Sequence, residues 1–322
     1  MRTTPDRVST TRVVLLDPID DEALAVLRSR YDVEVRIGLA QAEVAAAIRD
    51  ADAVILRSGV GLPGPALAGA RRLKVIARAG SGTDNIDLAA ARAAGVQVFN
   101  VPGGSANAVA ELVLGLLLAL ARNITRADRF LREGQWRKSE LGGWELRGRT
   151  MGIVGLGAIG SRVAELAQGL SMRTIATAVR MDPQRRSREA DRGVTLMPLP
   201  DLLTRADVVC LALPLDERSR GLIAAPQLAL MKRTAVLVNV SRGGVVDEDD
   251  LVSALSDGTI AGAALDVFKA EGGATKLAAL DNVVLTPHLG GMSLDAQRAI
   301  GRLVVDNLRI ALGGGDAANR VC

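Results

Sequence analysis

The sequence is poor in several residue types, and each shortage excludes a class of protein. Its two cysteines, Cys210 and Cys322, are too few for a disulfide framework or for a structural zinc site built on cysteine, so no metal site is predicted. Aromatic residues make up 2% of the chain, which argues against a surface that stacks single-stranded nucleic acid. The chain contains one histidine, His288, so any chemistry that needs an imidazole must use this residue.

Long hydrophobic runs and a dominant charge are missing as well. The longest apolar run, 108–121, contains Glu111 and is too short to span a bilayer, so it predicts a buried helix. Residues 1–9 are polar and lack the apolar core of a signal peptide. Lys and Arg total 40 against 36 Asp and Glu, a net charge of +4 with no basic tail or stripe. These features predict a cytoplasmic protein that binds neither a membrane nor a nucleic acid.

A length of 322 residues predicts about two domains. In the first part of the chain, short apolar runs alternate with amphipathic helical segments. The predicted strands are 13–16, 33–35, 53–56, 74–77 and 96–99, and the predicted helices are 22–28, 41–48 and 86–94. Strand, helix and strand at this spacing define βαβ units and a mostly parallel sheet.

The pattern changes at a long helix, predicted over 106–122, and at a polar stretch, predicted to be irregular over 123–149. A second series of strands and a final helix follow, predicted at 150–154, 174–178, 208–213, 235–240, 261–267 and 283–285, with the helix over 295–311. The chain therefore contains two consecutive α/β arrays, without an internal sequence repeat.

A Gly-x-Gly-x-x-Gly motif, Gly155 to Gly160, lies between a predicted strand and a predicted helix. In a dinucleotide site, Gly155 permits the tight turn and Gly157 lets the backbone approach the pyrophosphate. Gly160 lets helix and strand pack closely, and the helix N-terminus faces the phosphates. The motif alone also occurs for packing reasons, but its strand–turn–helix context favours dinucleotide binding.

The acidic residue that normally binds the ribose hydroxyls of NAD is absent from its usual place. It is expected at the end of the next strand, where the sequence has Ala178. Asp182 would reach the ribose only if that strand were extended or bulged. Arg180, Arg185 and Arg186 follow, and they either hold a 2′-phosphate through bidentate contacts or form a solvated basic loop. NADP and NAD therefore both stay open, with NADP favoured.

Three further stretches carry side chains suited to acid–base chemistry. Arg242 follows the strand 235–240, Asp266 and Glu271 lie at the end of the strand 261–267 and beyond it, and His288 follows 283–285. The carboxyl ends of strands in an open α/β sheet border the ligand crevice. Each residue alone also has a structural interpretation, such as an ion pair or a solvated surface. Together with a dinucleotide site, they predict an acid–base centre.

These motifs together resemble the D-isomer-specific 2-hydroxyacid dehydrogenase family, closest to its 3-phosphoglycerate dehydrogenase and hydroxypyruvate/glyoxylate reductase branches. The resemblance covers nearly the whole chain. Beside the glycine motif and the Arg242, Glu271 and His288 motifs, it rests on the segments 57–58, 78–87, 100–104, 109–111 and 145–150. The sequence departs from the family pattern at Ser105, where many members have Asn, and at Gly272, where Pro is usual.

The resemblance implies a hydride transfer between a nicotinamide cofactor, NADP or NAD, and C2 of a D-2-hydroxy acid or 2-oxo acid. Arg242 would bind the carboxylate and carbonyl oxygens, His288 would move the proton, and Glu271 would favour the charged ring. Substrate contacts are implied for Arg57, Ser58, Gly80, Ser81 and Gly82, with the N–H groups of Ser81 and Gly82 meeting the carboxylate. Asp266 would accept from the nicotinamide carboxamide. Cofactor contacts are implied for Gly155, Gly157, Ala158, Ile159, Gly160, Val179, Arg180, Leu213, Pro214, Val240, Ser241, Asp266, His288 and Gly290.

The resemblance also implies a fold of two Rossmann-like α/β domains with parallel sheets and a cleft between them. The substrate-binding domain would be discontinuous, residues 1–104 and 292–322, and the dinucleotide-binding domain would span 105–291. A homodimer through the cofactor domain is implied, and no regulatory domain is expected after Cys322. A second hypothesis stays open, because dinucleotide-sensing, corepressor-like binding proteins share this fold. The sequence does not predict which 2-hydroxy acid is the substrate.

Overall fold

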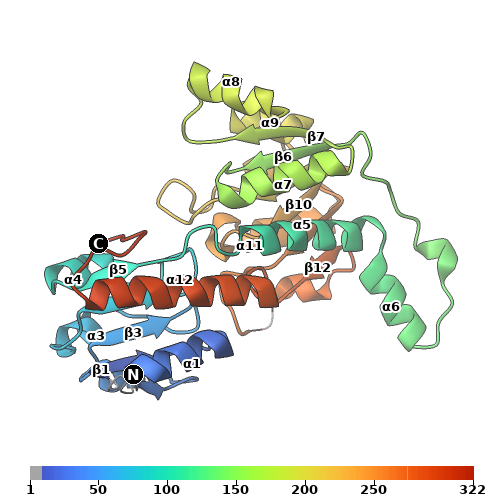
Figure 1. Ribbon diagram of the computed structural model, residues 1–322. Coiled ribbons are helices and arrows are strands. Elements are labelled where there is room, and N and C mark those ends of the chain that lie inside the picture. Colours follow the sequence, from blue (N-terminus) through green and yellow to red (C-terminus); the bar gives the residue numbers. More distant parts are fainter. Residues whose placement is uncertain (1–8, 274) are drawn as a thin grey trace, which may run out of the picture. The chain divides into compact units, whose positions relative to one another are not determined.

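A computed structural model describes residues 9–273 and 275–322 of the chain. The prediction made for residues 1–9 lies outside the described residues except at Ser9. The chain forms two compact units, Met1–Ser105 with Gly291–Cys322 and Ala106–Gly290 (Figure 1). Each unit holds one sheet, and every pair of neighbouring strands in both sheets is parallel. The predicted α/β class with parallel sheets is confirmed.

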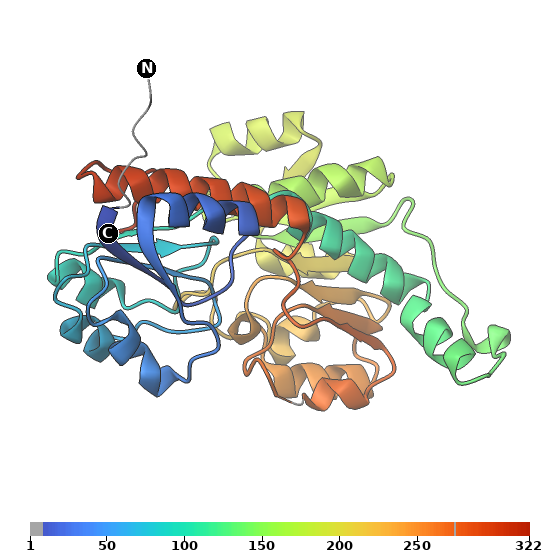
Figure 2. The ribbon, with the colours of Figure 1, turned by 60° about the horizontal axis from the view of Figure 1, so that its bottom comes forward.

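The first unit is built on a five-stranded sheet with the order β2-β1-β3-β4-β5. One face of this sheet packs on α1 and α12, and the opposite face packs on α2, α3 and α4 (Figure 2). The two faces alternate along each strand because successive side chains point to opposite sides. The strands are β1 (Ser9–Leu15), β2 (Tyr31–Val35), β3 (Ala53–Leu56), β4 (Val75–Arg78) and β5 (Gln97–Phe99), and the helices are α1 (Asp21–Arg30), η1 (Gln41–Glu43), α2 (Val44–Ile48), α3 (Gly64–Gly69), α4 (Leu88–Ala93) and α12 (Leu294–Leu312).

The second unit is built on a seven-stranded sheet with the order β12-β11-β10-β9-β6-β7-β8. Helices α5 and α7 pack on one face, and α9, α10 and α11 pack on the other. The strands are β6 (Thr150–Val154), β7 (Arg173–Thr177), β8 (Val194–Leu196), β9 (Val208–Leu211), β10 (Val236–Asn239), β11 (Gly262–Leu265) and β12 (Val283–Leu285). The helices are α5 (Ala106–Ala121), α6 (Ile124–Arg132), η2 (Lys138–Glu140), α7 (Ala158–Gly169), α8 (Pro183–Asp191), α9 (Leu199–Arg205), α10 (Ala225–Leu228), η3 (Gly243–Val245), α11 (Glu248–Ser256) and η4 (Lys276–Ala279).

The register of the second sheet brings the sequence motifs to one edge. Val154 at the end of β6 pairs with Leu211 and Thr177, and Asn239 pairs with Leu211 and Leu265. Leu265 in turn pairs with Leu285. The loops that follow these strands therefore leave the sheet at the same carboxyl edge. The strand order reverses at β6, which is where ligands bind in open α/β sheets.

The prediction of an irregular stretch over 123–149 is wrong, because helix α6 occupies Ile124–Arg132. Asn123 adopts a left-handed backbone conformation with a φ of 52°. This conformation interrupts the helix, so the chain changes direction between α5 and α6. The sequence carried a signal for this helix, because Ile124, Ala127 and Leu131 follow helical spacing between polar residues. Among the described residues, no single helix is long and apolar enough to cross a membrane; α5 and α6 reach that length and composition only as a pair bent by 63°.

Candidate active site

The glycine turn of the second unit joins β6 to α7, as the motif predicts. Gly155 has a φ of 98°, and a Cβ there would lie 2.5 Å from the Ala212 carbonyl oxygen. A Cβ on Gly160 would lie 2.1 Å from the Gly155 carbonyl oxygen, so helix and strand pack closely at this point. Packing alone therefore requires glycine at both positions. A Cβ on Gly155 would also lie 2.9 Å from the Leu213 Cβ, which puts Leu213 beside the turn.

Gly157 behaves differently from the other two glycines. It is the N-cap of α7, and a Cβ added to it would meet no protein atom within 4 Å. No side chain caps this helix, and its first intrahelical hydrogen bond runs from Ser161 N to Gly157 O. The backbone N–H groups of Ala158, Ile159 and Gly160 are thus left without intrahelical acceptors, next to the open space at Gly157. This donor set fits the pyrophosphate of a dinucleotide.

The ribose end of this region follows β7, which ends at Thr177. Ala178 is half-buried, while Val179 and Arg180 are exposed. The interpretation that the strand extends to Asp182 is wrong, because Asp182 caps α8 by accepting from the Arg185 N–H at 2.9 Å. That hydrogen bond, helped by the charges of Arg185 and Arg180, holds the pKa of Asp182 below its ordinary value.

The three arginines of this segment have different surroundings. Arg186 donates to the Met181 carbonyl at 2.9 Å and to the Leu196 carbonyl at 2.7 Å, so it ties α8 to β8. Arg185 donates to the carbonyl of Leu156 in the glycine turn at 2.9 Å. Arg180 makes no hydrogen bond or ion pair with any described residue, and its guanidinium is therefore available to a ligand.

The two side chains predicted to form an acid–base pair lie together beyond β11 and β12. His288 Nδ1 lies 2.9 Å from Glu271 Oε1 and 3.1 Å from Glu271 Oε2, and both side chains are partly exposed. Because Glu271 occupies Nδ1, Nε2 is the ring atom that can exchange a proton with a substrate.

Asp266 holds the loop that carries the histidine. Its buried carboxylate accepts from Thr286 Oγ1 at 2.7 Å, from Leu289 N at 2.7 Å and from Gly290 N at 2.8 Å. Its backbone carbonyl accepts from His288 N at 2.9 Å. The sequence interpretation gave Asp266 a contact with the cofactor and missed this anchoring role. A threonine two residues before the sole histidine was the available signal.

Arg242 follows β10 in a tightly held loop. Asn239 accepts from Ser241 N at 3.0 Å and from Ser241 Oγ at 2.7 Å, and it donates to the Arg242 carbonyl at 3.1 Å. Arg242 Nη1 donates to the Ser241 carbonyl at 2.7 Å. A Cβ on Gly243 would lie 1.9 Å from the backbone of Phe268, so this loop packs against the segment that leads to Glu271. Asn239 is a further residue that sequence reasoning missed.

The remaining predicted cofactor residues lie at the same edge of the second sheet. Val240 is buried between Asn239 and Ser241, and the Pro214 carbonyl accepts from Ser219 Oγ at 2.7 Å. A Cβ on Gly290 would lie 3.1 Å from Asp266 Oδ2, so glycine lets the loop approach that carboxylate. No group of three or more His, Cys, Asp or Glu side chains among residues 9–273 and 275–322 is arranged to hold a metal ion.

The first unit carries the predicted substrate loops after β3 and β4. The Gly80 carbonyl accepts from Val101 N at 2.9 Å, and the Ser81 carbonyl accepts from Asn100 Nδ2 at 2.6 Å. The N–H groups of Ser81 and Gly82 make no hydrogen bond within the described residues and remain available. In the other loop, Ser58 is exposed. Burial lowers the pKa of Arg57, and the negative charge of Asp17 acts in the opposite direction.

The second unit has the construction of a dinucleotide-binding α/β domain. It combines a parallel sheet, a glycine turn where the strand order reverses, and an uncapped helix N-terminus facing open space. A sequence profile described as "D-isomer specific 2-hydroxyacid dehydrogenase, NAD binding domain" matches residues 114–290. The chain belongs to the D-isomer specific 2-hydroxyacid dehydrogenase family, which confirms the resemblance drawn from the motifs.

Individual relatives agree with this assignment. The chain is 41% identical over 313 residues to the D-3-phosphoglycerate dehydrogenase of Methanocaldococcus jannaschii, a match that covers 96% of this chain and 59% of that protein. It is 39% identical over 307 residues to the hydroxypyruvate reductase of Thermotoga maritima, covering 94% of this chain and 98% of the other. The chain thus spans little more than half the length of the curated phosphoglycerate dehydrogenases that it matches.

A solved structure extends the likeness to three dimensions. The NADPH-dependent glyoxylate/hydroxypyruvate reductase of Sinorhizobium meliloti, crystallised with NADP and malonate, matches with a TM-score of 0.86 and 31% identity. The match covers 98% of this chain and 97% of that one.

Proposed function

We propose that this protein is an oxidoreductase that transfers a hydride between a nicotinamide cofactor and C2 of a D-2-hydroxy acid or 2-oxo acid. The observation that carries the proposal is the 2.9 Å contact between His288 Nδ1 and Glu271, at the same sheet edge as the glycine turn. When bound, the nicotinamide supplies or accepts the hydride, and the chain's own residues bind the acid and move the proton.

The proton step belongs to His288. In reduction, the charged ring donates from Nε2 to the C2 oxygen, and in oxidation the neutral ring takes that proton back. Glu271 stabilises the charged ring through Nδ1 and fixes its orientation. Arg242, whose guanidinium is always charged, stabilises negative charge on the substrate oxygen in the transition state.

The carboxylate of the substrate is assigned to the first unit. The N–H groups of Ser81 and Gly82 have no other acceptor within the described residues, and two adjacent backbone donors suit a carboxylate. Arg57 supplies a positive charge for a further anionic or polar group. Two types of substrate fit this proposal: phosphoglycerate-like acids, and the smaller hydroxypyruvate or glyoxylate. An activity assay with both types distinguishes them.

The proposal includes a preference for NADP over NAD. It is supported by the absence of a ribose-binding carboxylate, because that position holds Ala178 and Asp182 is engaged as a helix cap. Arg180 is unengaged and Arg185 lies against the glycine turn. A charge-assisted contact from Arg180 to a 2′-phosphate corresponds to about 1.5–3 kcal/mol, or roughly a ten- to hundredfold preference for NADPH.

The test is a panel of 2-oxo acids assayed with NADPH and NADH. We expect turnover with at least one acid and a higher kcat/KM for NADPH. The preference is lost in Arg180→Ala and kept in Arg186→Ala, a matched control whose side chain is already bound to backbone carbonyls. A wild-type preference for NADH, unchanged by Arg180→Ala, would refute the cofactor assignment. Cofactor-dependent assembly without turnover of any acid would favour the sensor hypothesis.

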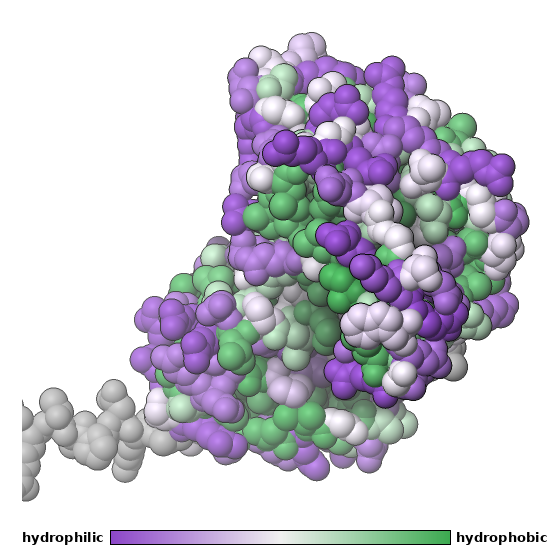
Figure 3. Space-filling model, turned by 90° about the vertical axis from the view of Figure 1, so that its right-hand side faces the viewer, coloured by the Kyte–Doolittle hydropathy of each residue, from purple (hydrophilic) through white to green (hydrophobic). Residues whose placement is uncertain are grey.

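We also propose that the protein works as a homodimer through the second unit. Helix α6 and the segment after it project from that unit in Figure 1. A groove of about 390 Å³ there is lined by Phe130, Leu131, Trp136 and Leu141 among others, and Trp136 is 82% exposed. Viewed from that side, hydrophobic side chains lie at the surface among hydrophilic ones (Figure 3). Exposed apolar patches of this kind mark protein contacts, and a second copy is the occupant proposed.

Sedimentation equilibrium tests the homodimer. The wild type is expected to sediment as a dimer and Trp136→Ser as a monomer or a weaker dimer, whereas a monomeric wild type would refute the proposal. The proposal further includes a cytoplasmic location, with which two free thiols in the chain are compatible.

A further inference from the structure

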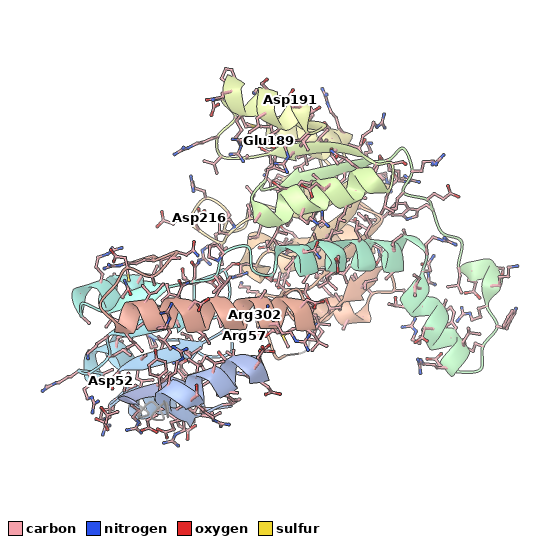
Figure 4. The ribbon with its side chains drawn as sticks, viewed as in Figure 1. Asp52, Arg57, Glu189, Asp191, Asp216 and Arg302 are labelled. Atoms are coloured by element: carbon pink, nitrogen blue, oxygen red, sulfur yellow. The ribbon has the colours of Figure 1, made fainter. Side chains whose placement is uncertain are left out.

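The side chain of Arg57 is held by a residue far away in the sequence. Arg57 follows β3, and its Nη1 donates to Gln297 Oε1 on α12 at 2.8 Å. Figure 4 labels Arg57 beside this helix. The backbone of Arg57 is fixed separately, because its N–H donates to Asp17 Oδ2 at 2.6 Å and its carbonyl accepts from Asn85 Nδ2 at 2.6 Å. Gln297 therefore fixes the position of the guanidinium and is not needed to hold the backbone of Arg57.

The orientation of Gln297 is determined by its two partners. A glutamine amide has one acceptor oxygen and one donor nitrogen. Nε2 of Gln297 donates to the Gly291 carbonyl, so Oε1 faces the guanidinium, which can only donate. A Cβ on Gly291 would lie 3.9 Å from Arg57 Nη2, and the guanidinium thus lies against the same residue that anchors Gln297.

The guanidinium of Arg57 is not paired directly with a carboxylate, although the charge of Asp17 opposes the effect of burial on it. Burial lowers the pKa of Arg57, yet a guanidinium stays charged in proteins. No carboxylate within the described residues forms an ion pair with it, and its closest side-chain partner is a neutral amide. A glutamate at 297 would have neutralised the charge, whereas glutamine orients it and leaves the remaining N–H donors for an anion.

We propose that Gln297 is a positioning residue, which holds the charged Arg57 guanidinium ready for an anionic group of the substrate. The inference rests on the proposed function in taking that anion to be a 2-oxo or 2-hydroxy acid. It assigns to α12 a part in substrate specificity, since the helix sets where the positive charge of the β3 loop is presented.

Two substitutions separate orientation from charge. Gln297→Leu removes both hydrogen bonds and keeps the Arg57 charge, whereas Gln297→Glu places a carboxylate beside Nη1. We expect KM for the best oxo acid to rise several-fold in Gln297→Leu and roughly ten- to hundredfold in Gln297→Glu. In both variants, kcat and the Kd for NADPH stay within about twofold of wild type, as for a loss of uniform substrate binding. Arg298→Gln is the matched control, because it removes an exposed charge from the next position of α12.

A second readout needs no turnover. Calorimetric titration with malonate, a dicarboxylate, should show weaker binding in Gln297→Glu than in wild type and in Arg298→Gln. Turnover by wild type with an unchanged KM and unchanged malonate affinity in both variants would overturn the inference and leave the proposed function intact. Parallel losses of melting temperature, kcat and NADPH affinity would show a purely structural role and overturn it as well. Weakened malonate binding in a protein that turns over no acid would support the inference and refute the proposed function.

Discussion

Replacing Gly157 with alanine separates the two interpretations of the glycine turn. Packing alone requires Gly155 and Gly160, but nothing in the protein occupies the space that a Cβ on Gly157 would enter. Its backbone, with φ −95° and ψ −157°, is extended and has a negative φ, so alanine can adopt it. If the turn has only a structural role, Gly157→Ala is harmless. If it binds a pyrophosphate, the new methyl group stands where the ligand approaches.

The expected change in folding stability is small, whereas the expected change in cofactor affinity is large. Alanine is a poorer N-cap than glycine, but it also restricts the unfolded chain, so the net change in unfolding free energy stays within about 1 kcal/mol. For a unit of this size, that corresponds to a shift in melting temperature of roughly 2–4 °C at most. Loss of one hydrogen bond to a charged group costs about 1.5–3 kcal/mol, which weakens cofactor binding roughly 10- to 150-fold.

The assay measures the melting temperature of each variant and its affinity for NADPH by calorimetric titration. Gly169→Ala, at the other end of α7, is the matched control, because a Cβ there also meets no atom within 4 Å and alanine favours a helix. It should leave both quantities unchanged or raise the melting temperature slightly. Gly160→Ala should instead lower the melting temperature, since its Cβ collides with backbone. Unchanged NADPH affinity in Gly157→Ala would refute the assignment of this turn to the pyrophosphate.

Three other predictions follow from the geometry. His288→Asn should lower kcat by about 10²- to 10⁴-fold with NADPH affinity unchanged, and near-normal turnover would remove His288 from the mechanism. Burial raises the pKa of the Cys210 thiol to about 12, so iodoacetamide should modify only Cys322 in the folded protein and both cysteines after unfolding, as mass spectrometry can count. Burial disfavours the charge of Asp207, but hydrogen bonds from Lys232 and from the Thr150 N–H outweigh it and lower its pKa. Asp207→Ala should therefore lower the melting temperature at pH 7 by roughly 2–12 °C, for a loss of about 1–3 kcal/mol. Because the folded pKa is the lower one, this difference from wild type should shrink as the pH falls below about 4, and a pH-independent difference would contradict the reasoning.

The parts of the site that follow strand ends could be predicted from the sequence. Strands are short apolar runs, and parallel pairing brings their carboxyl ends to one edge. The strand order therefore places the turn at Gly155 and the loops of Arg242 and His288 at the same edge of the sheet. The pairing of Glu271 with His288, 17 residues apart, followed from the resemblance and is present in the structure.

Contacts that depend on side chains from distant segments could not be predicted in this way. Gln297 meets Arg57 across 240 residues, and no periodicity marks a single amide on a helix face. Asp182 is a different case, because a local signal was available. An aspartate followed by proline marks an N-cap with proline at the first helical position, and that signature argued for a helix start and against an extended strand.

The carboxylate of Asp266 anchors the loop that carries His288. His288 has a φ of 56°, a left-handed backbone that costs a residue other than glycine about 1–3 kcal/mol. Hydrogen bonds from Thr286, Leu289 and Gly290 to Asp266 offset that cost and hold the imidazole beside Glu271 without help from a ligand. A carboxylate has about four acceptor sites, and these donors use three of them. One acceptor site is left without a donor among the described residues, on a carboxylate that is itself buried, and the cofactor contact that the sequence predicts for Asp266 would use this site. The two roles would place His288 and the cofactor next to the same fixed residue, Asp266. Hydride transfer to C2 and proton transfer to its oxygen require the two donors to be held close together in this way.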